Sequence, residues 1–363
     1  MTDGPPWPTL PGRDYHAADV YELERERVFA PGWYCLGRSS SLAEPGSYRA
    51  VEVAGESLIW IRDQLGIVRA FANTCRHRGT RLLDGEGTLK RAIRCPYHAW
   101  VYGFDGALLG SPNVKPSDGI DPETMGLWEV RLEEWDGFSF VNLDGRATPL
   151  QVELSEQPDS PVELARYRVG DLAVGATRTY EVAANWKIVV ENYHECLHCP
   201  TVHPELVKIM PLYRTGEVEE EGQTLGNSMG ELTSFTESGY SALPTLPGLD
   251  DVDVHTFYGA SVFPNLILNY HSETVNSVTI HPLGPDRSLV VSEFLFAPET
   301  VADHGFDPSE VVDFRDLVAR QDWEVCERAQ TGVRSRFYAN GWYPRQEKWI
   351  RSFNERYLVA RDG

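Results

Sequence analysis

Apolar and polar positions change in short runs through the first 150 residues, and this pattern predicts strands. Runs at 48–53, 57–62 and 67–73 are separated by Gly and Asp, and a last run lies at 136–143. Short strands bounded by turn residues indicate a small antiparallel β-domain. The polar stretch over 144–160 then separates this domain from the rest of the chain, so we place the boundary near residue 150.

Helical spacing appears in three places, where apolar residues recur every three or four positions. These places are residues 13–30, 185–197 and 311–337. Further strand runs lie at 178–184, near 262, and at 266–270, 275–281 and 289–296. We therefore predict an α+β fold with a helical N-terminal segment (1–40), an all-β domain (41–150) and a domain in which an antiparallel sheet packs against helices (151–363).

The segment 216–253 follows neither pattern. It is acidic, rich in Gly, Ser and Thr, and has no clear periodicity. Long connections of this kind are uncommon unless they are functional or mobile. A lid over a site and a disordered insert are both consistent with it.

The helix predicted over 185–197 has an unusual polar side. Glu191, Glu195 and His198 are spaced i, i+4 and i+7 and share one face, opposite an apolar face. Such a face is costly against a core unless its groups bind a metal or titrate. His203 follows after four intervening residues, in a stretch where two prolines bend the chain. Two histidines and a carboxylate are the ligands of non-haem Fe(II) oxygenases; a pair of surface histidines near a helix end is the alternative.

The C-terminal helix contains a carboxylate inside its apolar stripe. Asp322 lies four residues after Val318, on the side that faces the core, whereas Asp313 and Asp316 have the spacing of solvated residues. A buried carboxylate costs several kcal/mol unless it is paired or binds a metal. Asp322 is therefore the candidate third ligand, with a salt bridge to a neighbouring arginine (Arg320 or Arg328) as the alternative.

A second group of candidate ligands lies in the β-domain. Cys75 and His77 are followed, after 17 residues, by Cys95 and His98. Each loop supplies one thiolate and one imidazole, which suits a [2Fe–2S] cluster with two Cys on one iron and two His on the other. Structural zinc accepts the same four ligands, but zinc fingers usually pair like ligands. Gly79 would permit a tight turn beside the first loop.

Composition and charge exclude several classes of function. The net charge is −21, which argues against binding to nucleic acid or anionic membranes. No apolar run approaches the roughly 20 residues of a membrane span, and the N-terminus lacks a secretory signal. We therefore expect a cytoplasmic protein that binds neither nucleic acid nor membranes. Cys196 and Cys199 are interpreted as packing residues.

The pattern Cys75-x-His77-x17-Cys95-x2-His98, together with the later Asn-Trp-Lys…Glu-x2-His-x4-His segment, resembles the α-subunits of Rieske non-haem iron oxygenases. The resemblance covers the whole chain in the expected order. The sequence of residues 191–200 most resembles that of the choline, carnitine and glycine betaine monooxygenases, one branch of the ring-hydroxylating family. It implies a Rieske [2Fe–2S] domain, a helix-grip catalytic domain with a curved sheet, and mononuclear Fe(II) with O2 as cosubstrate.

The same resemblance implies how the centres are arranged. His198, His203 and Asp322 would hold the mononuclear iron, because the family takes its carboxylate from the C-terminal helix. A homotrimer is implied, in which Glu195 bridges to His98 of the adjacent subunit, although relatives carry Asp at that position. Asn192 is a further candidate catalytic residue. Electrons would come from an NAD(P)H-dependent reductase, directly or through a ferredoxin, because the chain has no dinucleotide fingerprint of its own.

Two substrate classes are compatible with these parts. A quaternary ammonium compound, hydroxylated or oxidatively N-demethylated, would need an aromatic cage. Hydroxylation of an aromatic or polycyclic ring is the alternative, as a mono- or a dioxygenase. The available aromatic residues are Tyr193, Phe257, Tyr258, Phe263 and Tyr270. A pure electron carrier would not need the second domain, and a zinc hydrolase would not need the Cys–His loops.

Overall fold

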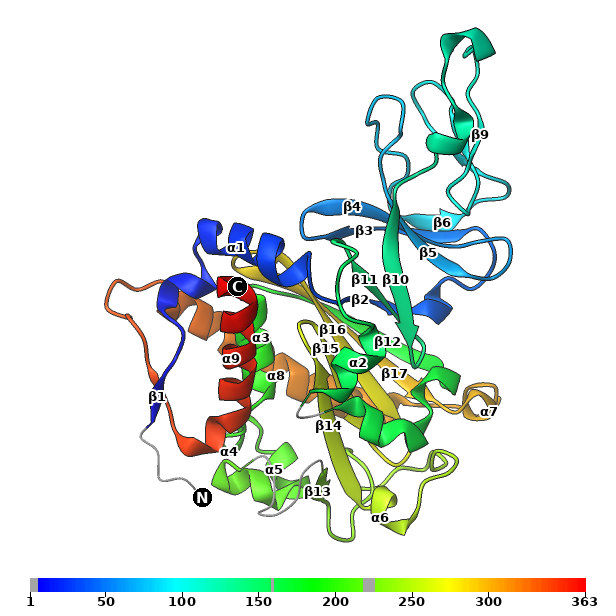
Figure 1. Cartoon of the computed structure of the whole chain (residues 1–363). Helices are drawn as coiled ribbons and strands as arrows, with labels where there is room; N and C mark the ends of the chain where they lie inside the picture. Colours follow the sequence, from blue (N-terminus) through cyan, green and yellow to red (C-terminus); the bar gives the residue numbers. More distant parts are fainter. Residues whose placement is uncertain (1–5, 158–159, 218–225) are drawn as a thin grey trace. The chain divides into compact units, whose positions relative to one another are not determined.

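The computed structural model describes residues 6–157, 160–217 and 226–363 (Figure 1). The chain forms two compact units: a small unit over 25–150, and a large unit that joins the chain up to Glu24 to 151–363. The division after Leu150 lies at the boundary expected from the sequence. Residues 25–40, which we expected in the N-terminal segment, lie in the small unit. Among the described residues, no helix is long and apolar enough to cross a membrane.

The small unit is built from strands, as predicted. The strands predicted at 48–53, 57–62 and 67–73 are present with shifts of one residue at their ends. One sheet has seven strands in the order β2 (Tyr34–Arg38), β11 (Phe138–Asn142), β10 (Glu129–Trp135), β5 (Val68–Ala72), β4 (Glu56–Arg62), β3 (Ser47–Val53) and β6 (Glu86–Thr88). A second sheet contains β7 (Ile93–Arg94), β8 (Val101–Tyr102) and β9 (Leu108–Gly110).

The N-terminal helix is shorter than predicted. The region 13–30 contains a 3-10 turn (Gly12–Tyr15), α1 (Ala18–Glu24) and a π-helical turn (Arg25–Phe29). The next residues, Trp33 to Leu36, are buried, and β2 pairs with β11. Because those apolar residues complete the small sheet, this part of the chain belongs to the small unit.

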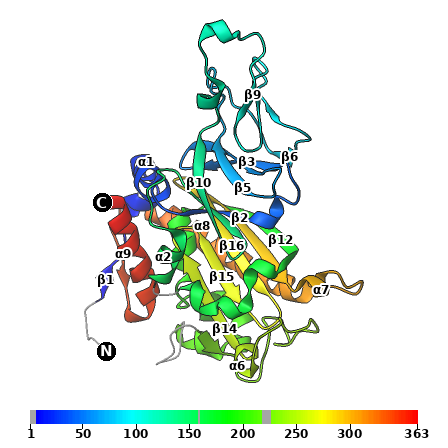
Figure 2. The ribbon, with the colours of Figure 1, turned by 45° about the vertical axis from the view of Figure 1, so that its right-hand side comes forward.

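The large unit contains a two-stranded sheet of β1 (Trp7–Pro8) and β18 (Trp342–Tyr343), and a six-stranded antiparallel sheet with helices against it. Its strand order is β12 (Ala173–Val182), β17 (Arg287–Phe296), β16 (Val275–Gly284), β15 (Leu266–Tyr270), β14 (Thr256–Val262) and β13 (Gly226–Ser228). The helices are α2 (Leu150–Ser155), α3 (Trp186–Tyr193), α4 (Cys199–Val202), α5 (Leu206–Ile209), α6 (Asp251–Val254), α7 (Pro298–Val301), α8 (Ser309–Val333) and α9 (Lys348–Asp362). In both views α8 crosses one face of the sheet (Figures 1 and 2). The predicted α+β, helix-grip arrangement is confirmed.

Buried polar contacts hold α3 in place. The Lys187 ammonium forms an ion pair with Glu24, and both side chains are buried. Glu24 also accepts hydrogen bonds from Trp186 Nε1 (3.0 Å) and Tyr357 Oη (2.8 Å). At the start of α3, Gln330 of α8 accepts a hydrogen bond from the Asn185 backbone N–H at 2.7 Å. These bonds satisfy charges that would be costly if buried alone, and they fix α3 relative to α8 and α9.

The segment 216–253 is described only in part. Residues 218–225 lie outside the described residues, so the choice between lid and insert is not decided there. In the described part, β13 pairs with β14 at the edge of the large sheet. Gly226 and Asn227 of β13 line the cavity discussed below.

Candidate metal centres

The helix that we predicted over 185–197 ends earlier, because α3 stops at Tyr193. The Glu195 carboxylate accepts the backbone N–H groups of Leu197 (2.5 Å) and His198 (3.3 Å), which replaces helical hydrogen bonding with a local turn. Cys196 and Cys199 are buried in an apolar cluster, in agreement with their interpretation as packing residues, and they also form a disulfide across this turn, which was not expected. Glu195 and His198 consequently do not extend one helical face.

Glu191, the first member of that predicted face, lies elsewhere. Its carboxylate accepts hydrogen bonds from Tyr15 Oη at 2.9 and 3.0 Å. Burial raises the pKa of Glu191 to about 7, although the bonds from Tyr15 and Asn354 oppose this. The acid therefore supports the packing behind α3 and does not take part in the candidate site.

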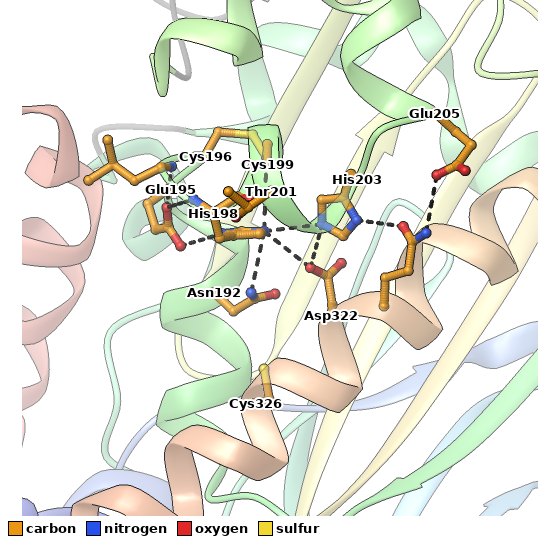
Figure 3. A network of polar contacts seen from close by, with 12 residues as sticks. Asn192, Glu195, Cys196, His198, Cys199, Thr201, His203, Glu205, Asp322 and Cys326 are labelled. Carbon is orange, nitrogen blue, oxygen red and sulfur yellow. Dashed lines mark hydrogen bonds and ion pairs between the residues drawn. A yellow bond between two sulfur atoms is a disulfide. The ribbon is translucent and has the colours of Figure 1, made fainter.

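Two imidazoles and a carboxylate meet in front of α8, as Figure 3 shows. His198 Nε2 lies 3.1 Å from His203 Nε2. Asp322 Oδ1 lies 2.8 Å from His203 Nε2 and 3.2 Å from His198 Nε2. These three residues are the candidate ligands selected from the sequence, and the fold brings their atoms to one point.

The outer nitrogen of each imidazole faces an oxygen. His198 Nδ1 contacts Glu195 Oε1, and His203 Nδ1 lies 2.8 Å from Gln321 Oε1. With a metal bound, an acceptor at Nδ1 would keep the proton there, so that each Nε2 lone pair is free for the metal. Gln321 Nε2 donates in turn to Glu205 at 3.1 Å. This arrangement fits a metal held by Nε2 of both histidines and by the carboxylate.

Gln321 and Glu205 were not selected from the sequence. Gln321 directly precedes Asp322, and Glu205 follows His203 by two residues. Their proximity to candidate ligands is a usable signal, but amides and acids next to a motif are common. Only the fold shows that they form one chain of hydrogen bonds to His203.

The electrostatics of the three-residue site favour a positive charge. Burial alone would lower the pKa of His198, but Asp322 and Glu195 raise it to about 9. Burial likewise opposes the charged form of Asp322, yet the hydrogen bonds from His198 and His203 lower its pKa. The site thus stabilises a cation between its imidazoles and carboxylate, and a divalent metal satisfies that requirement.

The two arginines that could have formed a salt bridge with Asp322 have other partners. Arg320 donates to Asp316 at 2.7 Å, and Arg328 donates to Glu324 at 2.6 Å. Asp322 therefore does not form the salt bridge that was the alternative to metal binding. Cys199 Sγ lies 3.9 Å from His198 Nε2, but the disulfide removes it as a thiolate ligand.

Asn192 lies next to the histidines. Its Nδ2 is 3.5 Å from His198 Nε2, and its side chain lines the cavity beside them. At that distance the contact is weak. The position of Asn192 allows it to contact whatever binds at the open side of the three-residue site.

The Cys–His loops of the small unit also converge. The ring centroids of His77 and His98 are 4.6 Å apart, and Cys75 Sγ lies 3.2 Å from Tyr102 Oη. Burial opposes ionisation of Cys95, but the backbone N–H groups of Tyr97 and His98 lower its pKa. Both thiols are buried, whereas His77 is exposed.

Backbone geometry shapes both loops. Gly79 has φ of +68° and donates its N–H to the Cys75 carbonyl at 2.9 Å, so the tight turn expected there is present. In the second loop, Ala99 donates to the Cys95 carbonyl at 3.1 Å. The His77 ring stacks on Trp100, with centroids 4.9 Å apart. These paired turns, with the Tyr97 and His98 N–H groups directed at the Cys95 sulfur, fit the environment of a [2Fe–2S] cluster.

A cavity of about 210 Å³ opens beside the three-residue site of the large unit. Of the five aromatic residues proposed for a cage, Tyr193 and Phe257 line it, whereas Tyr258, Phe263 and Tyr270 do not. The latter point away because alternate residues of a strand face opposite sides of the sheet, or because they lie beyond its end. The cavity has further aromatic walls: Tyr180, Tyr213, Phe235, Trp323 and Trp349.

Two protein families match this chain. Residues 32–131 match the Rieske [2Fe-2S] domain, and residues 169–360 match the ring hydroxylating alpha subunit (catalytic domain). The carnitine monooxygenase oxygenase subunit of Escherichia coli (strain K12) is 32% identical, and the match covers 91% of this chain and 85% of that protein. The glycine betaine monooxygenase oxygenase subunit of Chromohalobacter salexigens is 28% identical, and the match covers 93% of this chain and 82% of that protein.

Solved structures give the same relationship. A quaternary ammonium Rieske monooxygenase, CntA, superposes with a TM-score of 0.79 at 28% identity, covering 98% of this chain and 95% of that one. Naphthalene 1,2-dioxygenase from Rhodococcus sp. superposes with a TM-score of 0.76 at 22% identity, and the match covers 98% of this chain and 94% of that one. The second match supports the fold alone.

Proposed function

This chain belongs to the Rieske non-haem iron oxygenases as an α-subunit, and from that premise we propose that it oxidises a quaternary ammonium compound. The observation that supports this most is the cavity beside His198 and His203, whose walls include the aromatic rings of Tyr193 and Phe257. Aromatic faces attract a quaternary ammonium, which has no hydrogen to donate. The related enzymes named above act on carnitine and glycine betaine.

Oxygenases of this family use a Rieske [2Fe-2S] cluster, a mononuclear iron and O2. We propose that the cluster is held by Cys75, His77, Cys95 and His98. The mononuclear iron would be held by His198, His203 and Asp322. When bound, this iron supplies O2 activation, driven by electrons that reach it through the cluster.

The residues of the chain have three tasks in this scheme. Glu195 and Gln321 fix the proton on Nδ1 of the two imidazoles, so that each Nε2 presents its lone pair. The aromatic walls hold the ammonium and exclude water. Asn192 lines the open side of the site, where it can orient the substrate.

The proposed reaction inserts one oxygen atom of O2 into a C–H bond of an N-methyl group. One N-methyl group of the quaternary ammonium substrate, O2, two electrons and two protons give an N-hydroxymethyl group and water. The hydroxymethyl ammonium then breaks its C–N bond to give a tertiary amine, formaldehyde and a proton. A substrate hydroxylated at another carbon would keep the oxygen as a stable alcohol.

We propose a homotrimer in which Glu195 carries electrons between subunits, and an NAD(P)H-dependent reductase that reduces the cluster directly or through a ferredoxin. Supporting the first point, Glu195 holds His198 through Nδ1. His77 is exposed in the small unit, and His98 is partly exposed, so an imidazole edge can meet a neighbouring carboxylate. A carboxylate between two metal-bound imidazoles is a plausible electron path.

The substitution Glu195→Gln tests the bridge. We expect both metal contents and the visible spectrum of the cluster to be retained, while turnover falls by about two orders of magnitude, because a neutral amide binds two imidazoles less tightly. Glu324→Gln, an exposed position on α8 that pairs with Arg328, is the matched control. Turnover of Glu195→Gln close to that of the wild type would contradict the bridge.

A substrate panel tests the reaction class. Trimethylammonium compounds and small aromatic hydrocarbons are supplied with a Rieske reductase and NADH, and formaldehyde and ring-hydroxylated products are quantified. We expect formaldehyde in equal amount to the demethylated amine. Ring hydroxylation without any oxidation of the ammonium compounds would overturn the proposal.

A further inference from the structure

One charged residue of the cavity has no role in the scheme above. Arg315 lies on α8 and lines the cavity on the same helix as Asp322. Its guanidinium lies 5.5 Å from the centre of the Phe235 ring. Within the described ranges 6–157, 160–217 and 226–363, neither a hydrogen bond nor an ion pair of this guanidinium is found.

A guanidinium without such a partner is unusual in the surroundings of Arg315. Burial lowers the pKa of Arg315, and the groups that oppose the effect most are Tyr193, Tyr213 and Asp322. The tyrosines are neutral at neutral pH, and Asp322 is already hydrogen-bonded to both histidines. An arginine nevertheless keeps its charge in proteins. A desolvated positive charge without a carboxylate of its own is costly.

This charge also conflicts with a substrate that is only a cation. A trimethylammonium alcohol entering the cavity would be repelled by the guanidinium, since both charges are desolvated there. The conflict disappears if the ligand carries an anion at its other end. A carboxylate is the best match, because the planar guanidinium can bind both of its oxygens at once.

We propose that Arg315 binds the carboxylate of a zwitterionic substrate, a quaternary ammonium acid, while its N-methyl end lies at His198, His203 and Asp322. This rests on the proposed function and narrows it from quaternary ammonium compounds in general to those with a carboxylate. The seven-residue step from Arg315 to Asp322 corresponds to about two helical turns, or roughly 10 Å along the axis. The substrate would therefore carry its two charges at opposite ends.

The first test compares probes that differ only at the anionic end. Trimethylammonium acids with one to three methylenes between nitrogen and carboxyl are measured beside their primary amides, by equilibrium binding to the iron-loaded enzyme and by formaldehyde release. We expect the best acid to bind about 30-fold more tightly than its amide, as charge-assisted hydrogen bonds do. Acids and amides that bind and react equally well would overturn the role of Arg315.

The second test changes the residue. In Arg315→Gln the acid-to-amide affinity ratio should fall to nearly one, and Arg315→Lys should recover part of it, because a lysine keeps the charge but not the two-point geometry. Arg328→Gln, an exposed position on the same helix, should keep the wild-type ratio. A Gln variant that retains the wild-type ratio would contradict the proposal.

Failure of the carboxylate site and failure of the proposed function give different results. If the ammonium probes are oxidised without preference for the acid, the carboxylate site is wrong and the proposed function stands. If none of the acids or amides is oxidised by an enzyme that contains both metals, the proposed function is wrong and this inference fails with it. Because the first test uses the wild-type enzyme, an Arg315 variant that does not fold still leaves the proposal open to refutation.

Discussion

The two groups of candidate metal ligands are built in opposite ways. In the small unit, Cys75, His77, Cys95 and His98 lie close together in the sequence and are positioned by backbone turns. In the large unit, His198, His203 and Asp322 come from two segments far apart in the chain, and side chains position them. A local backbone-built site depends on turn geometry, whereas a distributed site depends on packing and on hydrogen bonds to the ligands.

The exposure of the ligands differs as well. His77 is exposed in the small unit, and His203 of the large unit is buried. An electron store benefits from ligands close to the surface, because electrons pass to a neighbour through them. A site that handles O2 and substrate benefits from a buried position that excludes water.

Removing one ligand from each group tests whether the two centres form independently, and this should have the largest effect on turnover. We expect Cys95→Ala to lose the visible spectrum and acid-labile sulfide of the cluster while retaining mononuclear iron. Asp322→Asn should retain the spectrum and lose that iron. Each change should lower turnover by about three orders of magnitude or more, because each removes a step that the reaction requires. Sulfide and iron analyses check the outcome.

The control for the second variant is Asp313→Asn, which changes an exposed carboxylate on the same helix and should keep both metals. Loss of both metals in either ligand variant would show that the two centres do not form independently.

A smaller effect is expected when a supporting side chain of the large unit is changed. Gln321→Met removes the acceptor that faces His203 Nδ1 and keeps the length of the side chain. Loss of such outer partners typically weakens metal binding about 10- to 100-fold. Competition with a chelator measures the iron affinity, and the cluster spectrum should not change. Gln346→Met, elsewhere in the large unit, is the control; an unaltered iron affinity in Gln321→Met would contradict a side-chain-built site.

The large unit should also respond to pH through Glu191, a buried acid of α3. Burial raises the pKa of Glu191 to about 7 from 4.5, so the folded state binds its proton more tightly than the unfolded state. Stability from this group is full below about pH 4.5 and is lost as the pH rises toward 7. At about 1.4 kcal/mol per pKa unit, the loss is on the order of 3 kcal/mol.

Glu191→Gln removes that dependence. We expect its melting temperature to exceed that of the wild type under mildly alkaline conditions and the difference to shrink under mildly acidic ones, as followed by thermal unfolding of the apo and metal-loaded proteins. An equal difference under both conditions would argue against a buried titrating acid.

The smallest effect is expected from the backbone of the small unit. A methyl group added at Gly79 meets only Thr74 Oγ1 at 3.8 Å, so Gly79→Ala has no clash but must hold a φ of +68°. The strain is about 1 kcal/mol. Gly110→Ala, which has open space and no such φ, is the control. Thermal unfolding should separate the two, and equal melting temperatures would mean that the turn relaxes freely.

The difference between a local ligand group and a distributed one also explains which features could be predicted from the sequence. The four residues of the small unit form a compact pattern, and the strands around them alternate regularly, so motif and fold were both visible. His198 and His203 were visible for the same reason. Asp322 required the helical stripe of α8, because nothing near it in sequence resembles the histidine segment.

Other features depend on side-chain contacts between distant segments. The end of α3 at Tyr193 follows from the Glu195 turn and the disulfide, which compete with a helical pattern that continues in the sequence. Gln321 and Arg315 are ordinary residues in a polar helix until the fold directs them toward His203 and the cavity. Which aromatic residues face the cavity depends likewise on the exact register of β14 and β15.

The regular repeat of α8 fixes the distance between two residues with proposed functions, Arg315 and Asp322. This helix of 25 residues carries both the proposed iron ligand and the proposed carboxylate receptor, so their separation changes only in steps set by the helical repeat. Moving the arginine to Ala319, which also lines the cavity, would bring it closer to the oxidising end by about four residues, or roughly 6 Å. The double variant Arg315→Ala, Ala319→Arg should therefore shift preference toward shorter acids, so that chain-length selectivity could be set by the choice of helical position.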